Sequence, residues 1–440
     1  MFKLILEQPQ LFTDEYFLTN NQLIEEYLVY LHFSGLRSGE KKSQEFQKIV
    51  RHNKLKRLLT AAVTLPFWKS RIKNECIDAK DIESMLHFLQ VTSKLDLRSV
   101  SLEERTNYNI ASRYGVITAT SGSTGEPLQF FIDRRLRIRQ WALMSRVGGL
   151  RYFSRRLLVH LWPTQNPNPL FGGHFFSVKT TEELQYQIPD ICRLVSQPNS
   201  ILHGLPSLLR LLSEVAEKSG LALRPQVVIT SGEELSPEAR TILSEKFHCK
   251  VASYYGSREL SVMAGQCDIG RFHENSEDVI FEVVSENGEP LKIGETGRLV
   301  VTGLNSYIAP FIRYHLGDYG FFYDDSCPCG NPLPSFNFKG RAHDTVPIIL
   351  SDGNHIFPYK LTGIFNKRFK KIRQYQIDHY APNSFLVKVI PTGVFNENDL
   401  LELTLELKNI TRNGKIVLHC VESIEKNGSK ILPYIKSFKD

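Results

Sequence analysis

The sequence predicts an α/β protein with a helical lead-in, a large central domain and a small α+β domain at its C-terminal end. Three patterns support this fold class. Apolar residues recur at three- and four-residue spacing between 18 and 90, which predicts amphipathic helices. From about residue 114, short apolar runs alternate with helix-like stretches, as expected for mostly parallel strands. Between 278 and 322 the pattern changes to strands and turns, and a mixed unit follows residue 340.

The predicted domains follow from these changes in pattern. Residues 1–110 form the lead-in packed on the large domain, 111–340 form the rest of the large domain, and 341–440 form the small domain. In the large domain, the expected strands include YGVITA, LLVHLW, QVVIT and KVASYY, and the expected helices include PSLLRLLSEVAEK and SPEARTILSEKF. In the small domain we expect two amphipathic helices and the strands TVPIIL, IRQYQIDHY, SFLVKVI and KIVLHC.

Length and composition exclude several classes of protein. With 440 residues, of which 42% are hydrophobic and 23% charged, the chain can form a large core and a ligand cleft. Its net charge of +7 is spread along the chain, which favours phosphorylated ligands or an acidic partner over dedicated nucleic-acid binding. No stretch approaches the roughly 18 apolar residues of a membrane helix, and the N-terminal apolar run is too short for a signal peptide. We therefore expect a cytoplasmic protein, with the oligomeric state open and a homodimer as one option.

A loop rich in hydroxyl groups and glycine lies within TATSGSTGEPLQF, between two expected strands. Hydroxyls donate hydrogen bonds and glycines let the backbone come close to a ligand, so the loop suits an anion, most simply a phosphate. It lacks the lysine of the common G-x-x-x-x-G-K-S/T phosphate loop. An ordinary surface turn is the alternative interpretation. The candidate phosphate-binding residues are Thr120, Ser121, Gly122, Ser123, Thr124 and Gly125.

Three further stretches carry residue types that suit a nucleotide. In SYYGSREL an aromatic residue beside a glycine can lie against a base, and Glu259 can ligate a magnesium ion that carries phosphates. In PFIRYHLGD, Asp318 follows a glycine and can accept both hydroxyls of a ribose. GRAHD places Arg341 where the small domain begins. Each stretch on its own is also compatible with an ordinary loop or turn.

Together, in this order, the four stretches resemble the adenylate-forming superfamily of acyl-CoA synthetases and adenylation domains, most closely its phenylacetate-CoA ligase-like branch. The matching stretches are TSGSTGEP, YYGSRE, and TGRLVVTGL with PFIRYHLGD. LPFWKSRI and VTSKLDLR resemble segments further upstream in that branch. The resemblance covers roughly residue 50 to the end. It implies a large adenylate-forming domain with several subdomains, followed by a small mobile domain.

The resemblance also implies the roles of individual residues. The hydroxyl-rich loop would close over the β- and γ-phosphates of ATP, and Glu259 would hold Mg²⁺. Asp318 would bind the ribose, and Arg341 would lie near the ribose and a phosphate. Tyr255 would stack on the adenine. The remaining ATP-binding residues would be Ser231, Gly232, Glu233, Gly256 and Ser257.

Three positions depart from the family pattern. Arg258 stands where Ser or Thr is usual, and it can supply charge to a phosphate or pair with a carboxylate. His343 replaces an aspartate of the hinge pattern Gly-Arg-x-Asp-Asp, leaves Asp344 alone, and so leaves the hinge residue open. Leu128 stands where a lysine often follows the loop proline.

A candidate metal site comes from the cysteines. Seven cysteines are an odd and sparse set for a chain of this length, which argues against a disulfide framework. Cys327 and Cys329 lie in CPCG, and Cys267 and His273 lie about sixty residues upstream. Three thiolates and an imidazole suit tetrahedral zinc, and buried cysteines with a turn histidine are the alternative. The resembled branch often carries this pattern, which implies a structural Zn²⁺ near the nucleotide site.

The resemblance implies a catalytic lysine near the C-terminal end, and EKNGSKIL offers Lys430 for this role. A lysine ammonium can bridge a carboxylate and an α-phosphate, and a solvated basic tail is the alternative. The implied activity is ATP-dependent adenylation of a small organic acid, aromatic or acyl, followed by transfer to coenzyme A. Two alternatives stay open: transfer to a carrier-protein phosphopantetheine or an amine, and a nucleotide-binding regulatory protein without catalysis.

Overall fold

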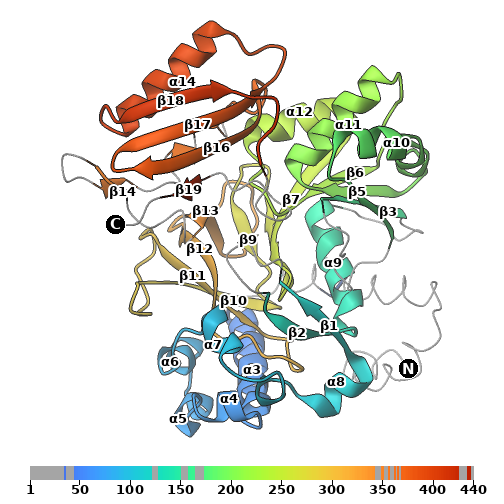
Figure 1. Cartoon of the computed structure of the whole chain (residues 1–440). Helices are drawn as coiled ribbons and strands as arrows, with labels where there is room; N and C mark the ends of the chain where they lie inside the picture. The colour runs from blue at the N-terminus through green and yellow to red at the C-terminus, as the bar shows by residue number, and fades with distance from the viewer. Residues whose placement is uncertain are drawn as a thin grey trace.

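A large mixed sheet separates a helical lead-in, at the bottom of Figure 1, from a small domain at the top. The predicted fold class, an α/β protein with a small C-terminal α+β unit, is confirmed. The structure is a computed structural model that describes residues 34–35, 44–120, 127–149, 157–163, 173–341, 348–350, 355–356, 361–362, 364–365, 368–425 and 434–437.

The large sheet has eleven strands in the order β10-β11-β12-β13-β9-β8-β7-β6-β5-β3-β4. The strands are β3 (Leu157–Trp162), β4 (His174–Ser177), β5 (Ser200–Gly204), β6 (Val227–Thr230), β7 (Lys250–Ser257), β8 (Ser261–Gln266), β9 (Phe272–Glu274), β10 (Val279–Val284), β11 (Gly297–Gly303), β12 (Tyr314–Phe322) and β13 (Ser335–Arg341). From β4 to β7 the neighbours pair in parallel, and from β7 to β10 they pair antiparallel. The sheet therefore has a parallel half and an antiparallel half.

Helices cover both faces of the parallel half, which explains its continuous apolar sequences. They are α9 (Leu136–Gly148), α10 (Thr181–Val195), α11 (Pro206–Lys218) and α12 (Pro237–Phe247). Successive residues of a strand point to opposite faces. Val159 and Leu161 pack against α10 to α12, whereas Leu158 packs in a different core with α9. The strands and helices expected between 157 and 255 all form.

One long helix and several short ones make up most of the described part of the lead-in. They are α3 (Gln44–Ala62), α4 (Pro66–Lys69), α5 (Asn74–Asp78), α6 (Ile82–His87), α7 (Lys94–Arg98), the 3-10 helix η3 (Glu103–Arg105) and α8 (Tyr108–Tyr114). Leu55, Leu58 and Leu59 of α3 are fully buried in one core with β10 to β12. Just before α7, the Thr92 N–H donates to the Arg313 carbonyl and the Thr92 carbonyl accepts from the His315 N–H, both at 2.9 Å. The lead-in is thus attached directly to β12.

The small domain has its own core. A four-stranded sheet in the order β18-β17-β16-β19 carries α14 (Glu397–Ile410) on one face, as Figure 1 shows. Its strands are β16 (Ile372–Ala381), β17 (Ser384–Pro391), β18 (Lys415–Cys420) and β19 (Tyr434–Lys436), and a separate pair consists of β14 (Ile348–Ile349) and β15 (His355–Ile356). Phe385 and Leu403 are buried in a core that contains no described residue of the large domain.

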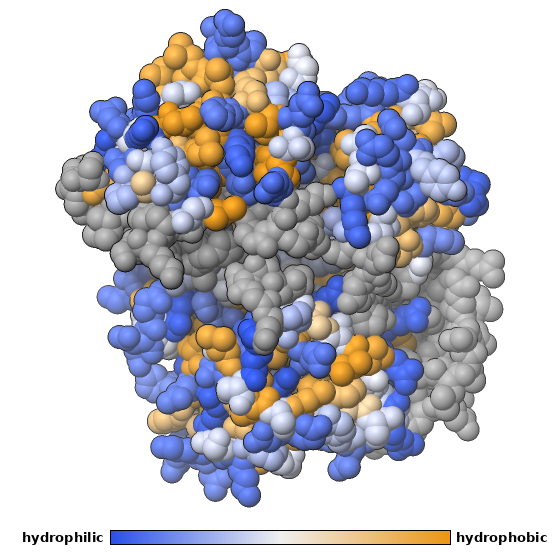
Figure 2. Space-filling model, in the orientation of Figure 1, coloured by the Kyte–Doolittle hydropathy of each residue, from blue (hydrophilic) through white to orange (hydrophobic). Residues whose placement is uncertain are grey.

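The visible surface is mixed, with blue and orange side chains interspersed (Figure 2). Orange side chains gather over α14, where Leu401 and Leu405 are exposed. In the part of the chain that the structure describes, no helix combines the length and apolar character needed to cross a membrane.

A buried arginine secures the lead-in to the antiparallel half. Arg313 donates to the carbonyls of Leu89 and Gly288 and pairs with Glu282 at 3.0 Å. Burial raises the pKa of Glu282, and Arg313 opposes that shift. The arginine therefore favours the charged form of a buried carboxylate while it joins three segments.

Replacing this arginine should destabilise the protein strongly. We expect Arg313→Ala to lower the free energy of unfolding by about 3–5 kcal/mol, because it leaves a buried charge without its partner. Urea denaturation followed by circular dichroism measures this change. Arg193→Ala is the control, since its pair with Asp190 is largely exposed and should contribute little. Equal stability of the two variants would contradict the role of Arg313.

Candidate functional site

The hydroxyl-rich loop connects two paired strands. β1 (Gly115–Ala119) and β2 (Gln129–Asp133) are antiparallel. Their pairing continues into Thr120, whose N–H donates to the Leu128 carbonyl and whose Oγ1 accepts from the Leu128 N–H, both at 3.0 Å. Thr120 therefore closes the base of the loop. The other predicted loop residues, Ser121, Gly122, Ser123, Thr124 and Gly125, lie outside the described residues.

Tyr255 and Asp318 meet although 63 residues separate them. The Tyr255 hydroxyl donates to Asp318 Oδ2 at 2.6 Å, and the Asp318 side chain is only 7% exposed. The Tyr255 ring contacts the Phe338 ring edge-on, with 4.2 Å between centroids, in a cluster of phenylalanines. Across the β12–β13 ladder, Asp318 pairs in register with Arg341. The structure therefore brings together Tyr255 of β7, Asp318 of β12 and the backbone of Arg341 at the end of β13.

Glu259 lies in the turn between β7 and β8. Its Oε1 accepts a hydrogen bond of 3.1 Å from the Tyr314 hydroxyl, and burial, reinforced by the Glu259 charge, raises the pKa of Tyr314. Tyr314 thus stays a donor and orients the carboxylate. Glu259 lines a pocket together with Asp133 and Ser306. Arg258, one of the departures from the family pattern, donates to Thr118 Oγ1 at 3.3 Å and so reaches the base of the hydroxyl-rich loop.

A β-bulge shapes the turn that carries Glu259. The β7–β8 register shifts between Tyr255 and Gly256. A Cβ at position 256 would lie 2.3 Å from the Ser261 carbonyl oxygen, so only glycine fits there without movement. The Ser257 hydroxyl accepts from the Leu260 N–H at 3.1 Å and tightens the same turn. Gly256 and Ser257 therefore act on the site through backbone geometry.

The segment Ser231–Glu233 follows β6 at the carboxyl end of the parallel strands. Gly232 adopts a positive φ of 80°, which favours glycine. Glu233 accepts from the Ser207 N–H at 3.0 Å and from the Ser207 hydroxyl at 2.9 Å, at the first turn of α11. In this structure the Glu233 carboxylate thus holds the start of α11.

A buried polar cluster that the sequence analysis missed lies beside this segment. His160 Nδ1 and His203 Nδ1 are 2.9 Å apart, and His203 Nε2 is 3.0 Å from Ser231 Oγ and 3.2 Å from the Tyr254 hydroxyl. Burial, with His160 alongside, lowers the pKa of His203 well below its usual value. The two Nδ1 atoms are close enough for one ring to donate a hydrogen bond to the other. The only sequence signal was a histidine in each of two strands that are otherwise apolar.

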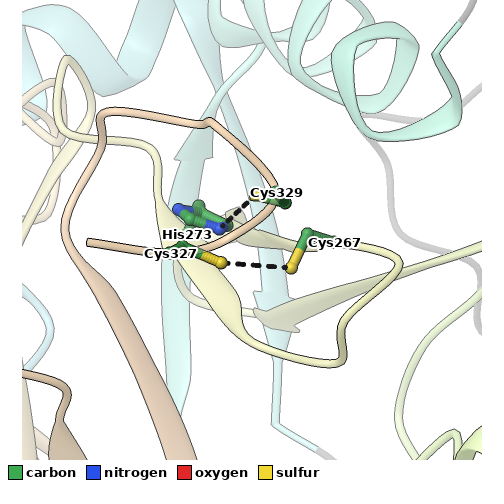
Figure 3. Close-up of side chains that lie close together, drawn as sticks. All are labelled: Cys267, His273, Cys327 and Cys329. Carbon is green, nitrogen blue, oxygen red and sulfur yellow. Dashed lines mark hydrogen bonds between the residues drawn. The ribbon is translucent and has the colours of Figure 1, made fainter. Parts of the chain in front are cut away.

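The predicted metal ligands come together (Figure 3). Their four ligand atoms lie within 4.8 Å of one another. Cys267 Sγ and Cys327 Sγ are 3.8 Å apart, and Cys329 Sγ is 3.3 Å from His273 Nε2. His273 Nδ1 donates to the Leu333 carbonyl at 3.0 Å, which turns Nε2 towards the thiols, and burial lowers the pKa of His273. A tetrahedral zinc site needs sulfur atoms roughly 3.8 Å apart and a neutral imidazole, so the four residues fit this metal.

Other predicted residues cannot be placed. Lys430, His343 and Asp344 lie outside the described residues, and only the backbone of Arg341 is described. The described part of the site therefore consists of Thr120, the Ser231 segment, the Tyr255–Glu259 turn, Asp318 and the cysteine cluster.

Comparisons with known proteins agree with this geometry. No family model matches the chain. A phenylacetate-coenzyme A ligase of Thermus thermophilus is 24% identical over 367 residues, which cover 76% of this chain and 78% of that protein. The crystal structure of 2-hydroxyisobutyryl-CoA ligase in the postadenylation state, in complex with R3-HIB-AMP, has a TM-score of 0.74 at 18% identity and covers 90% of both chains.

Two further structures extend the comparison. The same ligase in the thioesterification state, in complex with 2-HIB-AMP and CoA, has a TM-score of 0.58 at the same coverage. Anthranilate CoA ligase AuaEII in complex with anthranoyl-AMP has a TM-score of 0.53 at 13% identity, covering 72% of this chain and 65% of that one. The fold is that of the adenylate-forming CoA ligases, and the resemblance inferred from the motifs is confirmed.

The bulge glycine gives a direct test of how the site is built. We expect Gly256→Ala to destabilise the protein by about 1–3 kcal/mol, because the new methyl group overlaps the Ser261 carbonyl. Thermal unfolding monitored by calorimetry measures this effect. Gly393→Ala is the matched control, since its Cβ meets no atom within 4 Å. If both variants melt like the wild-type protein, close packing does not fix the Tyr255–Glu259 turn.

Proposed function

We propose that this protein is an ATP-dependent ligase that joins an organic acid, aromatic or acyl, to coenzyme A. The observation that carries the proposal is that β7 and the turn after it meet β12 twice in an adenylate-forming fold: Tyr255 donates to Asp318, and Tyr314 donates to Glu259. The 24% identical relative acts on phenylacetate by its name, and this supports an aromatic or acyl acid as the substrate.

The reaction has two steps that balance in atoms and charge. First, a carboxylate oxygen of the acid attacks the α-phosphorus of ATP, and the bond to pyrophosphate breaks. Second, the thiol of coenzyme A gives up its proton to solvent, its sulfur attacks the acyl carbon of the adenylate, and AMP leaves with the bonding electrons. Charge grows on pyrophosphate in the first step, so hydrogen-bond donors and a divalent cation near it lower the barrier.

The described residues suit distinct parts of ATP. The buried carboxylate of Asp318 can accept both ribose hydroxyls, and the Tyr255 ring offers a face for the adenine. Glu259, oriented by Tyr314, offers oxygen ligands to Mg²⁺, which would neutralise phosphate charge when bound. The hydroxyl-rich loop, whose base Thr120 closes, is assigned to the phosphates. Arg341 is assigned to the ribose and phosphate by its pairing with Asp318 in the ladder.

The small domain completes the proposal. We assign residues 1–110 to the lead-in, 111–340 to the large domain and 341–440 to a small domain that moves between the two steps. The higher TM-score against the postadenylation state than against the thioesterification state of one ligase, 0.74 against 0.58, supports an arrangement that corresponds to the first step. Lys430 is assigned to the same step, as a cation between the incoming carboxylate and the α-phosphate.

The cysteine cluster is assigned a structural Zn²⁺ held by Cys267, His273, Cys327 and Cys329. The cluster joins β9 to the segment before β13. These two strands pair with each other through His273 and Ser335. Four protein ligands leave no open position, so such a metal would hold strands together and take no part in the chemistry.

Pyrophosphate release from a panel of organic acids tests the activity. We expect release only with ATP, Mg²⁺ and a suitable acid, and an acyl-CoA product when coenzyme A is present. Glu259→Gln should lower kcat at least roughly tenfold and weaken the response to Mg²⁺, since it removes one charged oxygen ligand. Tyr186→Ala, at a side chain exposed on α10, is the control and should behave as wild type.

The outcome also separates the alternatives. Pyrophosphate release without an acyl-CoA product points to a carrier protein or an amine as the acceptor. No release with any acid, together with tight ATP binding, contradicts the ligase and leaves a regulatory nucleotide-binding protein.

The metal is tested without any assay of activity. Protein prepared without chelator should contain about one zinc per chain by elemental analysis, because all four ligand atoms are already in place. Cys327→Ser with Cys329→Ser should lose this zinc and lower Tm. Cys420→Ser, at an exposed cysteine in the small domain, should keep the metal and Tm unchanged. Wild-type protein that contains no zinc and melts at the same Tm as the double cysteine variant would refute the zinc site.

A further inference from the structure

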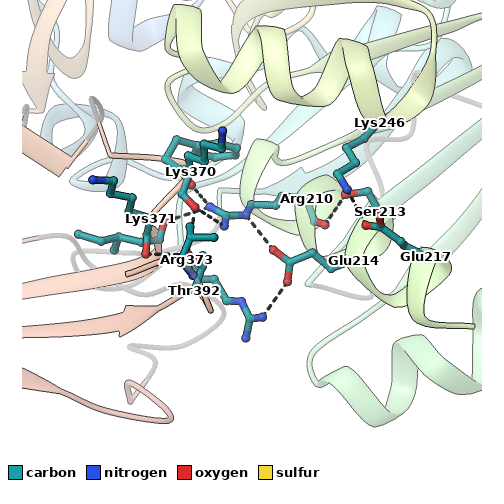
Figure 4. Close-up of polar contacts among 12 residues, drawn as sticks. Arg210, Ser213, Glu214, Glu217, Lys246, Lys370, Lys371, Arg373 and Thr392 are labelled. Carbon is teal, nitrogen blue, oxygen red and sulfur yellow. Dashed lines mark hydrogen bonds and ion pairs between the residues drawn. The ribbon is translucent and has the colours of Figure 1, made fainter. Parts of the chain in front are cut away.

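An arginine of the large domain reaches into the small domain (Figure 4). Arg210 lies on α11, and its guanidinium donates to three backbone carbonyls just before β16 and at its start: those of Phe369, Lys370 and Ile372. The guanidinium also stands over the Phe369 ring, 4.9 Å from its centroid. Phe369 in turn packs against the core formed by α10, α11 and α12. One side chain thus collects four contacts with the small domain.

A carboxylate connects this arginine to a second one across the same boundary. Glu214, one turn further along α11, accepts from Arg210 Nε at 3.0 Å and pairs with Arg373 of β16, also at 3.0 Å. Burial lowers the pKa of Arg210, and Glu214 opposes this shift. The carboxylate therefore supports a buried guanidinium on its own helix and holds an arginine of the other domain.

Residues 368–372, three of whose carbonyls accept from Arg210, are bonded to the rest of the small domain. The Thr392 N–H and hydroxyl donate to the Lys371 carbonyl at 2.9 and 3.1 Å, and the Lys371 ammonium pairs with Asp399 of α14. Arg368 pairs with Glu406 of the same helix at 2.7 Å. Movement of the small domain as a body would therefore carry the whole segment away from α11.

These contacts belong to one arrangement of the two domains. A guanidinium that donates to three carbonyls requires them at fixed positions, because its donors form a rigid planar fork. Rotation of the small domain would remove the three carbonyls and the Phe369 ring together, and would leave Arg210 with Glu214 alone among these partners.

We propose that Arg210, Glu214 and Arg373 are positioning residues that hold the small domain in the arrangement for adenylation, and that their contacts across the boundary break before transfer to the thiol. The proposal rests on the proposed ligase function. It assigns to α11 and β16 a set of contacts that affects the two steps differently, although none of the three side chains is among the residues assigned to ATP.

The two half-reactions test this separately. Arg210→Lys keeps the charge but cannot supply the planar fork, so acid-dependent pyrophosphate release should fall roughly tenfold. Arg373→Ala, which removes a partly exposed partner, should reduce it by a smaller factor. Consumption of supplied acyl-adenylate by coenzyme A should not slow in either variant. Lys246→Ala, which removes an ion pair of α11 within the large domain, is the matched control for both steps.

An equal fall in both half-reactions would show a merely structural role, and unchanged half-reactions in Arg210→Lys would show no role; either result overturns the proposal. A wild-type protein that releases no pyrophosphate with any acid would instead contradict the ligase function.

Hydrogen exchange tests the contacts even in that case. In the substrate-free full chain, amides of 368–373 should exchange several-fold faster in Arg210→Lys than in wild type, because the segment loses its hydrogen bonds from Arg210. In Lys246→Ala these amides should exchange at the wild-type rate. Equal exchange in Arg210→Lys and wild type would show that these contacts do not hold the domains together.

Discussion

The double pairing of β13 is the constraint on which the site depends. β13 pairs with β12 along one edge and with β9 along the other, and both ladders are antiparallel. Through this one strand, β10, β11 and β12 join the rest of the sheet. Without it, the strand that carries Asp318 would have no fixed position relative to the strand that carries Tyr255.

Several other features reinforce the same junction. The Phe336 ring of β13 is fully buried and packs against Phe272 of β9 and Phe281 of β10. The four cysteine and histidine ligands gather at the end of the β9–β13 ladder, where a metal would tie the two strands together. Arg271 pairs with Asp325 beside them at 2.6 Å. β11 pairs along the other edge of β12, and the Thr92 bonds of the lead-in add to the hold at the start of the strand, so both edges of β12 are fixed.

Much of this architecture could be predicted from the sequence, for physical reasons. Strands buried on both faces must be apolar throughout, so LLVHLW and QVVIT identified the parallel half. Asp318 could be chosen because a carboxylate after a glycine suits a ribose, and Glu259 because a carboxylate three residues after Gly256 suits a metal that carries phosphates. The cysteine pair with its distant histidine could be chosen because zinc in proteins is commonly bound by thiolates and imidazole.

The remaining features depend on contacts that sequence spacing does not encode. The His160–His203 pair forms because two parallel strands place those positions side by side, and a single histidine in an apolar strand carries no sign of its neighbour. Arg210 resembled any charged residue of an amphipathic helix, since its carbonyl partners lie about 160 residues away. Glu233 was expected among the ATP-binding residues, but its bonds to Ser207 at the start of α11 were not foreseen.

The central claim is that the nucleotide binds where β13 holds β12 close to β7, at Asp318 and Tyr255, and titration calorimetry with ATP and Mg²⁺ tests it most directly. The account predicts that Asp318→Ala, if its circular dichroism spectrum matches that of the wild type, binds ATP at least roughly tenfold more weakly, because hydrogen bonds to a charged acceptor are lost. A folded Asp318→Ala variant that binds ATP with wild-type affinity would contradict it.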